Sequence, residues 1–293
     1  GVAGEFGDYC LELIAAEQER FKHLPDLGLN YAYHLDATAY AGFLREIAER
    51  HGVVRREGKI SEVRRAEDGD IGSLLLEDGS EIAGDLFVDC TGFRALLIEP
   101  RQIRFRTGTR RAHWHRNCIA IGLSSGFIEP LESTSIHMIQ RSVMRLMQMF
   151  PREGVHQPDI DEFNRQTAYE IEHIRDFIIL HYHLTNRTDT PFWRHCRTMD
   201  IPDGLRHRMA LFEQAGRVFR ANDELFAENS WTQVMLGQGL MPLSHHPVAD
   251  VMTEAEVTRF LSYITENVNK TVAGLPMHQD YLDSYCPAPE SDL

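Results

Sequence analysis

One stretch of the sequence, residues 118–150, dictates a local order of strand, loop and helix. Its apolar run Cys118–Ile121 is typical of a buried strand, and Gly122 follows it at once, where a turn is expected. Apolar residues then recur at intervals of three and four as far as Pro151, which predicts one long amphipathic helix. The strand needs a sheet and the helix needs an apolar neighbour, so the stretch indicates an α/β fold.

The start of this helix is the first candidate site. We expect the helix to open near Ser133 or Thr134, whose hydroxyl groups can cap free backbone N–H groups. Such N–H groups and the helix dipole attract an anion. Two carboxylates, Glu129 and Glu132, stand just before this start. Taken alone, they are explained well enough as helix-capping residues, because acidic side chains are favourable there.

The chain before this stretch predicts a second strand that ends in a small-residue turn. Residues 53–88 alternate with a period of two, and Asp68-Gly69 and Asp78-Gly79 are hairpin signals, so we expect an antiparallel meander. The meander returns to the apolar strand Asp85–Cys90, which runs into Thr91-Gly92. A glycine at that point lets the backbone approach a cofactor closely.

The N-terminal part of the chain predicts three further elements. Residues 9–21 are expected to form a helix, and residues 29–36 a short strand that ends at a helix cap. Residues 38–50 have apolar side chains at helical spacing, so we expect a second helix there, with Gly52 at its C-terminal end.

After Pro151 the chain is predicted to be mainly helical. Residues 161–182 carry an apolar stripe that is typical of a core helix. The stretch 222–242, with Asn229 and Trp231, mixes aromatic, amide, methionine and glycine residues. Such a mixture suits the wall of a substrate pocket. A buried loop with satisfied amides explains it equally well.

Composition excludes several classes of function. The net charge of −14 argues against binding to nucleic acid or to an anionic membrane. No apolar run approaches membrane-spanning length, and we expect no signal peptide. The five cysteines are scattered without a C-x-x-C pair, which suits a reducing, cytoplasmic location. The His-x-His pairs have no further ligands at suitable spacing, so no metal site is expected.

The string Gly-Phe-Ile-Glu-Pro-Leu-Glu-Ser-Thr-Ser-Ile-His, residues 126–137, resembles the signature of the flavin-dependent tryptophan halogenase family. Residues 89–94, Asp-Cys-Thr-Gly-Phe-Arg, are similar to the second dinucleotide-contacting turn of FAD-dependent hydroxylase-type flavoproteins. The resemblance implies a partial FAD-binding, hydroxylase-like domain over residues 1–150, which includes the halide and flavin loop. It implies a helical, substrate-side region over residues 151–293.

The resemblance also implies a reaction. Family members use FADH2 from a separate flavin reductase, with O2 and chloride or bromide, for electrophilic halogenation of an indole or another electron-rich aromatic. A small aromatic substrate is therefore expected, and a homodimer is compatible with the resemblance. Carried over residue by residue, it assigns Glu132 and Ser133 to catalysis, Thr134 and Ser135 to halide binding, Thr91, Gly92, Gly122, Leu123 and Ile136 to FAD binding, and Asn229 and Trp231 to the substrate.

The sequence departs from the family pattern in several places. It lacks an opening G-x-G-x-x-G strand and turn, and it lacks the W-x-W-x-I-P segment expected between residues 98 and 101. None of its three lysines stands where the family has a catalytic lysine, and it has no paired tyrosines of the kind that accompany free tryptophan. Two alternatives therefore stay open: a shortened, catalytically silent relative, and another FAD-dependent aromatic monooxygenase.

Overall fold

A computed structural model of the protein describes residues 4–24, 26–27, 29, 31, 36–91, 107–129, 131–221 and 224–287. The chain forms two compact units, each of which contains residues from both sides of position 150. The sheet unit consists of Val54–Arg208 and Phe219–Trp231, and the helical unit consists of Gly1–Val53, Met209–Val218 and Thr232–Leu293. This division differs from the predicted boundary at residue 150. The separation of flavin-side and substrate-side functions at that boundary stays a prediction.

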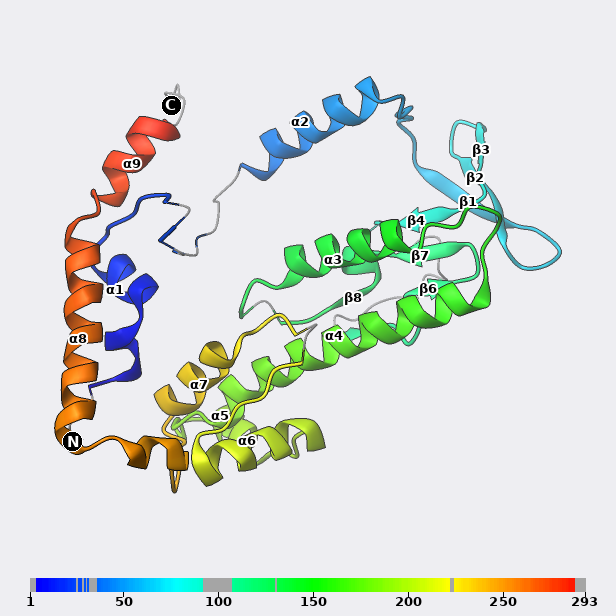
Figure 1. The fold of residues 1–293 in the computed structure, drawn as a ribbon. Helices are drawn as coiled ribbons and strands as arrows, with labels where there is room; N and C mark the ends of the chain where they lie inside the picture. Colours follow the sequence, from blue (N-terminus) through cyan, green and yellow to red (C-terminus); the bar gives the residue numbers. More distant parts are fainter. Residues whose placement is uncertain are drawn as a thin grey trace. The chain divides into compact units, whose positions relative to one another are not determined.

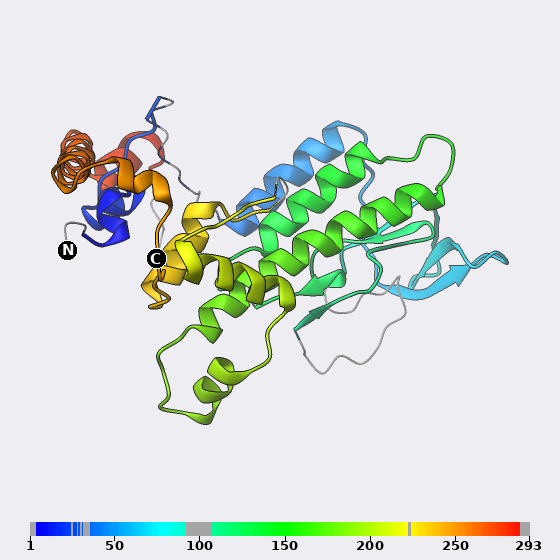
Figure 2. The same ribbon diagram turned by 60° about the horizontal axis from the view of Figure 1, so that its bottom comes forward.

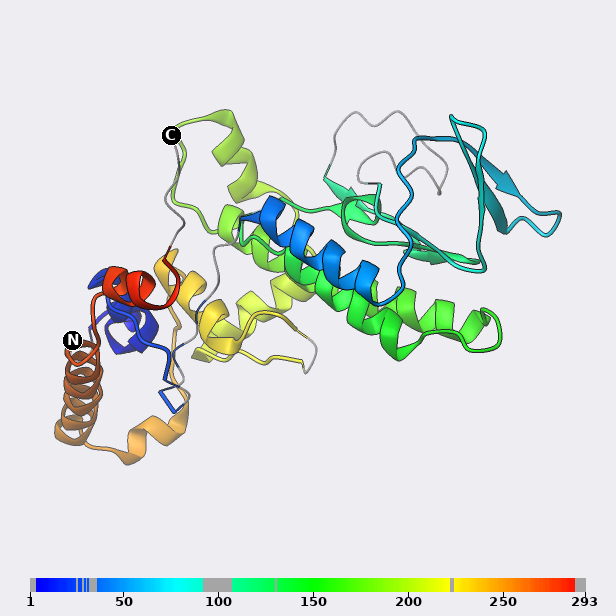
Figure 3. The ribbon, with the colours of Figure 1, turned by 90° about the horizontal axis from the view of Figure 1, so that it is seen from above.

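The sheet unit begins with the predicted antiparallel meander. Its strands β1 (Ile60–Arg65), β2 (Ile71–Leu76) and β3 (Glu81–Ala83) pair in chain order and lie at one end of the unit (Figures 1 and 3). Both hairpins form where the Asp-Gly pairs predicted them. Gly69 and Gly79 adopt φ angles of +89° and +83°, a region that side chains with a Cβ rarely enter.

Two smaller sheets follow the meander. In the first, β4 (Phe87–Asp89) pairs in parallel with β7 (Cys118–Ala120), and β7 pairs antiparallel with β6 (Trp114–His115). In the second, β5 (Gly108–Thr109) and β8 (Gly126–Phe127) form a two-stranded antiparallel ribbon. All strands that the structure describes lie before residue 128, as expected for a mainly helical C-terminal region.

Two helices, α3 (Ser135–Gln148) and α4 (Gln157–His183), lie against these sheets, and α5 (Pro191–Thr198) packs against α4. Helices α3 and α4 run alongside each other next to the small sheets (Figure 2). The predicted apolar stripe of α4 is confirmed, because its residues from Phe163 to Ile178 are buried at the expected spacing. The core between these helices and β6–β7 consists of Trp114, Ile119, Ile121, Leu146, Ile160 and Phe163.

The helical unit is built around α1 (Leu11–Glu17) and α8 (Glu254–Ala273), which pack against each other through Ala15, Val272 and Leu275. The predicted helix over residues 9–21 is wrong in extent, because Glu19 turns into the left-handed region and Arg20 bridges to Met277. The remaining elements of the chain are η1 (Phe6–Tyr9), α2 (Ala37–Arg50), η3 (Gly122–Ser124), α6 (Asp203–Ala215), α7 (Glu228–Gly237), η4 (Pro247–Val251) and α9 (His278–Tyr285).

Two more predicted elements lie before the meander. Helix α2 confirms the helix predicted over residues 38–50, with Asp36 accepting hydrogen bonds from two backbone N–H groups at its start. The strand predicted over residues 29–36 lies mostly outside the described residues. Among the helices that the structure describes, none combines the length and the hydropathy needed to cross a bilayer.

Candidate functional site

The parallel strands β4 and β7 end at the same edge of their sheet. Asp89 is paired with Ala120 at that edge. Thr91 follows β4 and donates from its N–H and its hydroxyl to the buried Asp89 carboxylate, at 2.9 and 2.7 Å. Gly122 follows β7 and turns with a φ of +71°. Ligands of open α/β sheets bind beyond the carboxyl ends of the strands, so this edge is a candidate cofactor site.

Hydrogen bonds from the loop after β7 stabilise this edge of the sheet. The Ser124 hydroxyl donates to the backbone carbonyls of Asp89 and Ile121, which ties η3 to both parallel strands. Leu123 remains 40% exposed beside the left-handed Gly122. Small residues, a left-handed glycine and an exposed apolar side chain fit a dinucleotide with a flat ring. Gly92, predicted to join this site, lies outside the described residues.

Helix α3 begins without a side-chain cap from its own N-cap residue. Thr134 is the N-cap residue and is buried, but its own hydroxyl makes no capping hydrogen bond. Ser135 is the first helical residue. Ser133 precedes them with a φ of +52°, a left-handed conformation that costs a residue other than glycine about 1–2 kcal/mol. The helix therefore presents free N–H groups, the arrangement that favours an anion.

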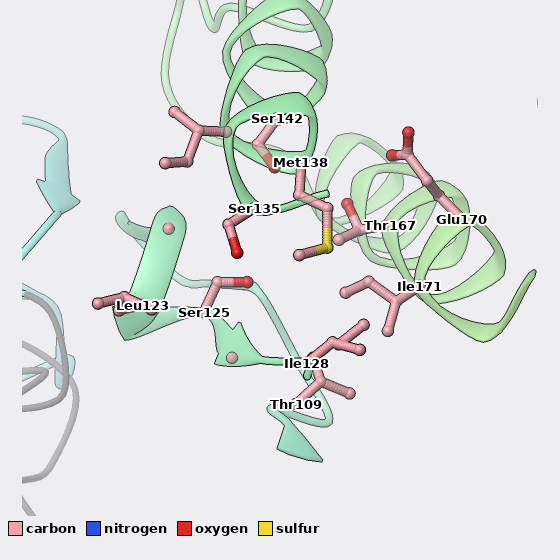
Figure 4. Close-up of a pocket in the computed structure, with 13 residues that line it drawn as sticks. Thr109, Leu123, Ser125, Ile128, Ser135, Met138, Ser142, Thr167, Glu170 and Ile171 are labelled. Atoms are coloured by element: carbon pink, nitrogen blue, oxygen red, sulfur yellow. The ribbon is translucent and has the colours of Figure 1, made fainter. Parts of the chain in front are cut away.

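Ser135, the first residue of the helix, lines a small cavity, the α3 pocket, which has a volume of about 60 Å³. Figure 4 shows Ser135 and Met138 of α3 opposite Ile128 and Ile171, with Ser125 below them. A single water molecule needs about 10–15 Å³ by this measure. The pocket therefore has room for one halide ion and a few water molecules.

One wall of the α3 pocket ends in a buried ionic network. Glu170 of α4 is 5% exposed, and its carboxylate accepts hydrogen bonds from His137, Arg141 and Arg145 of α3, at 3.1, 3.3 and 2.9 Å. Burial acts to raise the pKa of Glu170, but the hydrogen bonds from His137 and Arg145 outweigh it and hold the pKa below its ordinary value. Glu170 is therefore an anion at neutral pH, and it joins the two helices.

A buried histidine supports the opposite wall. His113 is 1% exposed, and its ring bonds to Ser125 at 2.5 Å and to Thr109 at 3.3 Å, two residues that line the pocket. Burial, followed by the nearby Arg145 and Arg110, lowers the pKa of His113 to about 4. The ring is therefore neutral at physiological pH, and it fixes the Ser125 hydroxyl by hydrogen bonding alone.

The two glutamates that precede α3 are both held by the end of α4. The side chain of Glu132 is 36% exposed and lies 3.2 Å from the imidazole of His181. The carboxylate of Glu129 faces the phenol of Tyr182, whose pKa it raises together with burial, the larger cause. Glu132 is not among the residues that line the α3 pocket. The structure thus adds His181 and Tyr182, which sequence reasoning did not assign.

The remaining predicted residues lie apart from the pocket wall. Ile136, predicted to contact FAD, is 70% exposed on α3. Asn229 is exposed at the start of α7, the helix that Glu228–Gly237 form within the stretch predicted as a pocket wall or buried loop. Trp231 is 1% exposed, with Phe177 and the guanidinium of Arg208 packed against its ring. Neither of the two predicted substrate residues lines the α3 pocket, and their role stays a prediction.

The described residues contain no cluster of three or more groups that could hold a metal ion. All five cysteines are free thiols. The groups that the site offers are a helix start, a hydroxyl bonded to a neutral imidazole, and a carboxylate close to a second imidazole.

Comparison with known proteins decides the family. Residues 1–100 and 97–254 match the family model of tryptophan halogenases. The chain belongs to the tryptophan halogenase family. The two matched segments meet at residues 97–100, where the sequence lacks the W-x-W-x-I-P segment. The resemblance recognised from residues 126–137 is confirmed.

Solved structures agree with this assignment. Xcc4156, a flavin-dependent halogenase from Xanthomonas campestris, is 46% identical with a TM-score of 0.95, over 99% of this chain and 76% of that chain. BrvH, a flavin-dependent halogenase from Brevundimonas sp. BAL3, is 34% identical with a TM-score of 0.89, over 96% of this chain and 76% of that chain. The predicted fold class is thereby confirmed.

More distant relatives are tryptophan halogenases. The tryptophan 6-halogenase ThaL of Streptomyces albogriseolus is 26% identical over 86% of this chain. The chain spans 67% of the length of that relative. The relatives are flavin-dependent halogenases, which are oxidoreductases that use FADH2, and the family therefore implies an FAD cofactor.

Proposed function

We propose that this protein halogenates an indole or another electron-rich aromatic by electrophilic chlorination or bromination, with FADH2, O2 and halide. The observation that carries the proposal is the α3 pocket, where an uncapped helix start meets a cavity of about 60 Å³. A halide ion fits that space and gains from the helix N-terminus. Family membership supplies the reaction class.

In this mechanism Thr134 and Ser135 hold the halide through backbone N–H groups. Family members with glycine at the second position would offer the same donors, and Ser135 keeps them because its side chain replaces only a hydrogen on Cα. Gly122, Thr91 and Leu123 would hold the flavin at the carboxyl edge of β4 and β7. Reduced flavin, when bound, supplies with oxygen the oxidising equivalents that make halide electrophilic.

Glu132 acts on the aromatic ring in the proposed reaction. A ring that has accepted an electrophilic halogen must lose a proton, and a carboxylate that reaches the ring can take it. The Nε2 atom of His181 lies 3.2 Å from that carboxylate and holds its orientation. Ser133 holds the turn between Glu132 and the helix start. The strained φ of Ser133 sets the direction in which both neighbours point.

The test is product formation by the whole chain with FAD, NADH, a separate flavin reductase, bromide and indole. We expect a product with the mass of bromoindole. Glu132→Gln keeps the size of the side chain and removes the base, so it should lower the rate by about a hundredfold. His181→Asn should lower it less, and Glu153→Gln, an exposed carboxylate in the loop before α4, should leave it unchanged.

Other products would overturn the proposal. Hydroxylated indole would point to an aromatic monooxygenase. The absence of product, together with no retained flavin, would leave a catalytically silent relative. Full bromination by Glu132→Gln would remove Glu132 from the mechanism.

The proposed reaction needs a second protein and a substrate. A separate flavin reductase is proposed as the source of FADH2, and a small aromatic molecule as the substrate, as is general in the family. A homodimer and a cytoplasmic location are further predictions. Gel filtration with light scattering measures the first, and subcellular fractionation measures the second.

A further inference from the structure

A second cavity, which we name the ribbon cavity, lies between the β5–β8 ribbon and α4. Its volume is about 280 Å³, several times that of the α3 pocket. Its walls are mainly isoleucine and phenylalanine side chains. They come from two elements: Phe127 and Ile128 from the ribbon side, and Ile171, Ile178 and Ile179 from one face of α4.

Two charged side chains interrupt these apolar walls, Glu129 and Arg175, and the guanidinium of Arg175 is paired with Asp176 at 2.7 Å. Glu129 directly follows β8 and lines the ribbon cavity. Its Oε2 atom is shielded from solvent and has no hydrogen-bond partner among the described residues. The group also interacts with the phenol of Tyr182 at the end of α4. A shielded carboxylate oxygen without a donor is costly, and native proteins rarely leave one without a reason.

The ribbon cavity adjoins the α3 pocket. Thr109, Ile128 and Ile171 line both cavities, so the two cavities share these side chains as part of their walls. A molecule in the ribbon cavity would therefore lie across Ile128 and Ile171 from the position proposed for the halide.

These observations specify the ligand by its chemistry. Apolar walls on two sides favour a flat aromatic molecule over a charged one. The shielded oxygen of Glu129 requires a hydrogen-bond donor on that molecule. We propose that the ribbon cavity binds the aromatic substrate, and that Glu129 selects substrates by accepting a hydrogen bond from a ring N–H group.

The proposal rests on the proposed function only for the reaction that the bound molecule undergoes, because the selection itself is a property of binding. A site built around an acceptor discriminates strongly against a ligand without the donor, since the acceptor is then left unpaired. Loss of a single such hydrogen bond corresponds to about a tenfold or larger loss of affinity.

Binding of two matched probes to the whole chain, measured by equilibrium calorimetry without turnover, tests the proposal. Indole carries the ring N–H, and 1-methylindole has a methyl group in its place. We expect indole to bind at least about tenfold more tightly to the wild-type protein. Glu129→Met, which keeps the length of the side chain without a strong acceptor, should make the two affinities equal. Glu129→Gln should give an intermediate ratio.

The ratio of the affinities for indole and 1-methylindole distinguishes selection by Glu129 from a loss of structure at the cavity. A purely structural role of Glu129 would weaken both probes together and leave the ratio unchanged. Glu172→Met, on the exposed face of α4, is the matched control and should reproduce the wild-type ratio. Equal binding of both probes to the wild-type protein, no binding of either, or an unchanged ratio in Glu129→Met would overturn the proposal. A lack of brominated product with an intact ratio would contradict only the proposed function.

Discussion

His113 is a titratable residue that is almost completely buried. It lies in the core of the sheet unit between Thr109 and Ser125, and the charged groups that act on its ring are the cations Arg145 and Arg110. Burial is the largest cause that lowers its pKa from 6.5 to about 4, followed by repulsion from Arg145 and Arg110. The folded protein therefore disfavours the protonated ring.

This depressed pKa predicts a loss of stability in mild acid. Below pH 6.5 the unfolded chain binds a proton at this position that the folded chain does not bind until about pH 4. Stability is therefore fully present above pH 6.5 and falls as the pH decreases. We expect His113→Asn, which keeps a polar contact but does not titrate, to remove about 1.5 kcal/mol of the decline between about pH 6.5 and about pH 5.

Urea unfolding of both proteins across this range measures the difference. The other histidines are common to both proteins and cancel in the comparison. Parallel pH profiles would show that His113 is not the titrating group.

For individual residues, the sequence predicted those that belong to a local pattern and missed those that the fold brings together from distant positions. Ser135 and Gly122 follow from local patterns, a helix start and a strand end, which are visible in consecutive residues. His181 and Tyr182 lie about 50 residues after the glutamates that they hold. No local pattern links them, so only the folded chain brings them together.

Helices α3 and α4 are joined at the level of elements by the Glu170 network. Arg145 is 4% exposed and donates to Glu170, Thr167 and Gln166. Both ends of the Arg145–Glu170 pair are buried, so removal of one partner leaves an uncompensated charge.

We expect Glu170→Leu to destabilise the sheet unit by about 3–5 kcal/mol. The double variant Glu170→Leu/Arg145→Met should recover most of this loss, because it removes both charges. Tryptophan fluorescence is a selective measurement, since all three tryptophans belong to the sheet unit. Additive effects of the two substitutions would contradict a direct pair.

The β5–β8 ribbon depends on a glycine. A Cβ at Gly126 would meet the carbonyl oxygen of Gly108 and the Cα of Thr109 at 2.8 Å, and backbone atoms cannot rotate away. We expect Gly126→Ala to push the strands apart and to destabilise the sheet unit by about 1–3 kcal/mol. Gly108→Ala is the matched control on the facing strand. Its Cβ would meet nothing within 4 Å, so its effect should stay within about 0.5 kcal/mol.

Thermal unfolding followed by tryptophan fluorescence compares the two variants. Equal effects of Gly126→Ala and Gly108→Ala would show that the contact across the ribbon does not require a glycine.

The elements themselves were predictable where their signals are local. The Asp-Gly hairpins and the apolar stripe of α4 need only neighbouring residues, and they were predicted correctly. Helix α1 ends earlier than its sequence pattern indicates, because Arg20 pairs with Met277, a residue near the other end of the chain. The parallel pairing of β4 and β7 lies outside local prediction for the same reason.

At the scale of the whole molecule, charge is the dominant property. The chain carries a formal net charge of −14 at pH 7, and like charges repel one another more in the compact state than in the unfolded chain. Most of its ion pairs are exposed, and exposed pairs contribute about 0–1 kcal/mol each. The Arg145–Glu170 pair is buried and is therefore screened less by salt.

Moderate salt should therefore stabilise this protein. Repulsion among unpaired carboxylates acts over distances comparable with the Debye length, about 10 Å at 0.1 M salt, so added NaCl screens it effectively. The exposed ion pairs lose little because they contribute little at low salt. We expect the midpoints of thermal unfolding to rise as NaCl increases from about 0.02 to about 0.3 M, at pH 7. Sucrose at matched osmolality is the control, because it stabilises compact states without screening charge. A fall in the midpoints with NaCl, or the same rise with sucrose, would mean that the exposed ion pairs or solvent exclusion outweigh the excess negative charge.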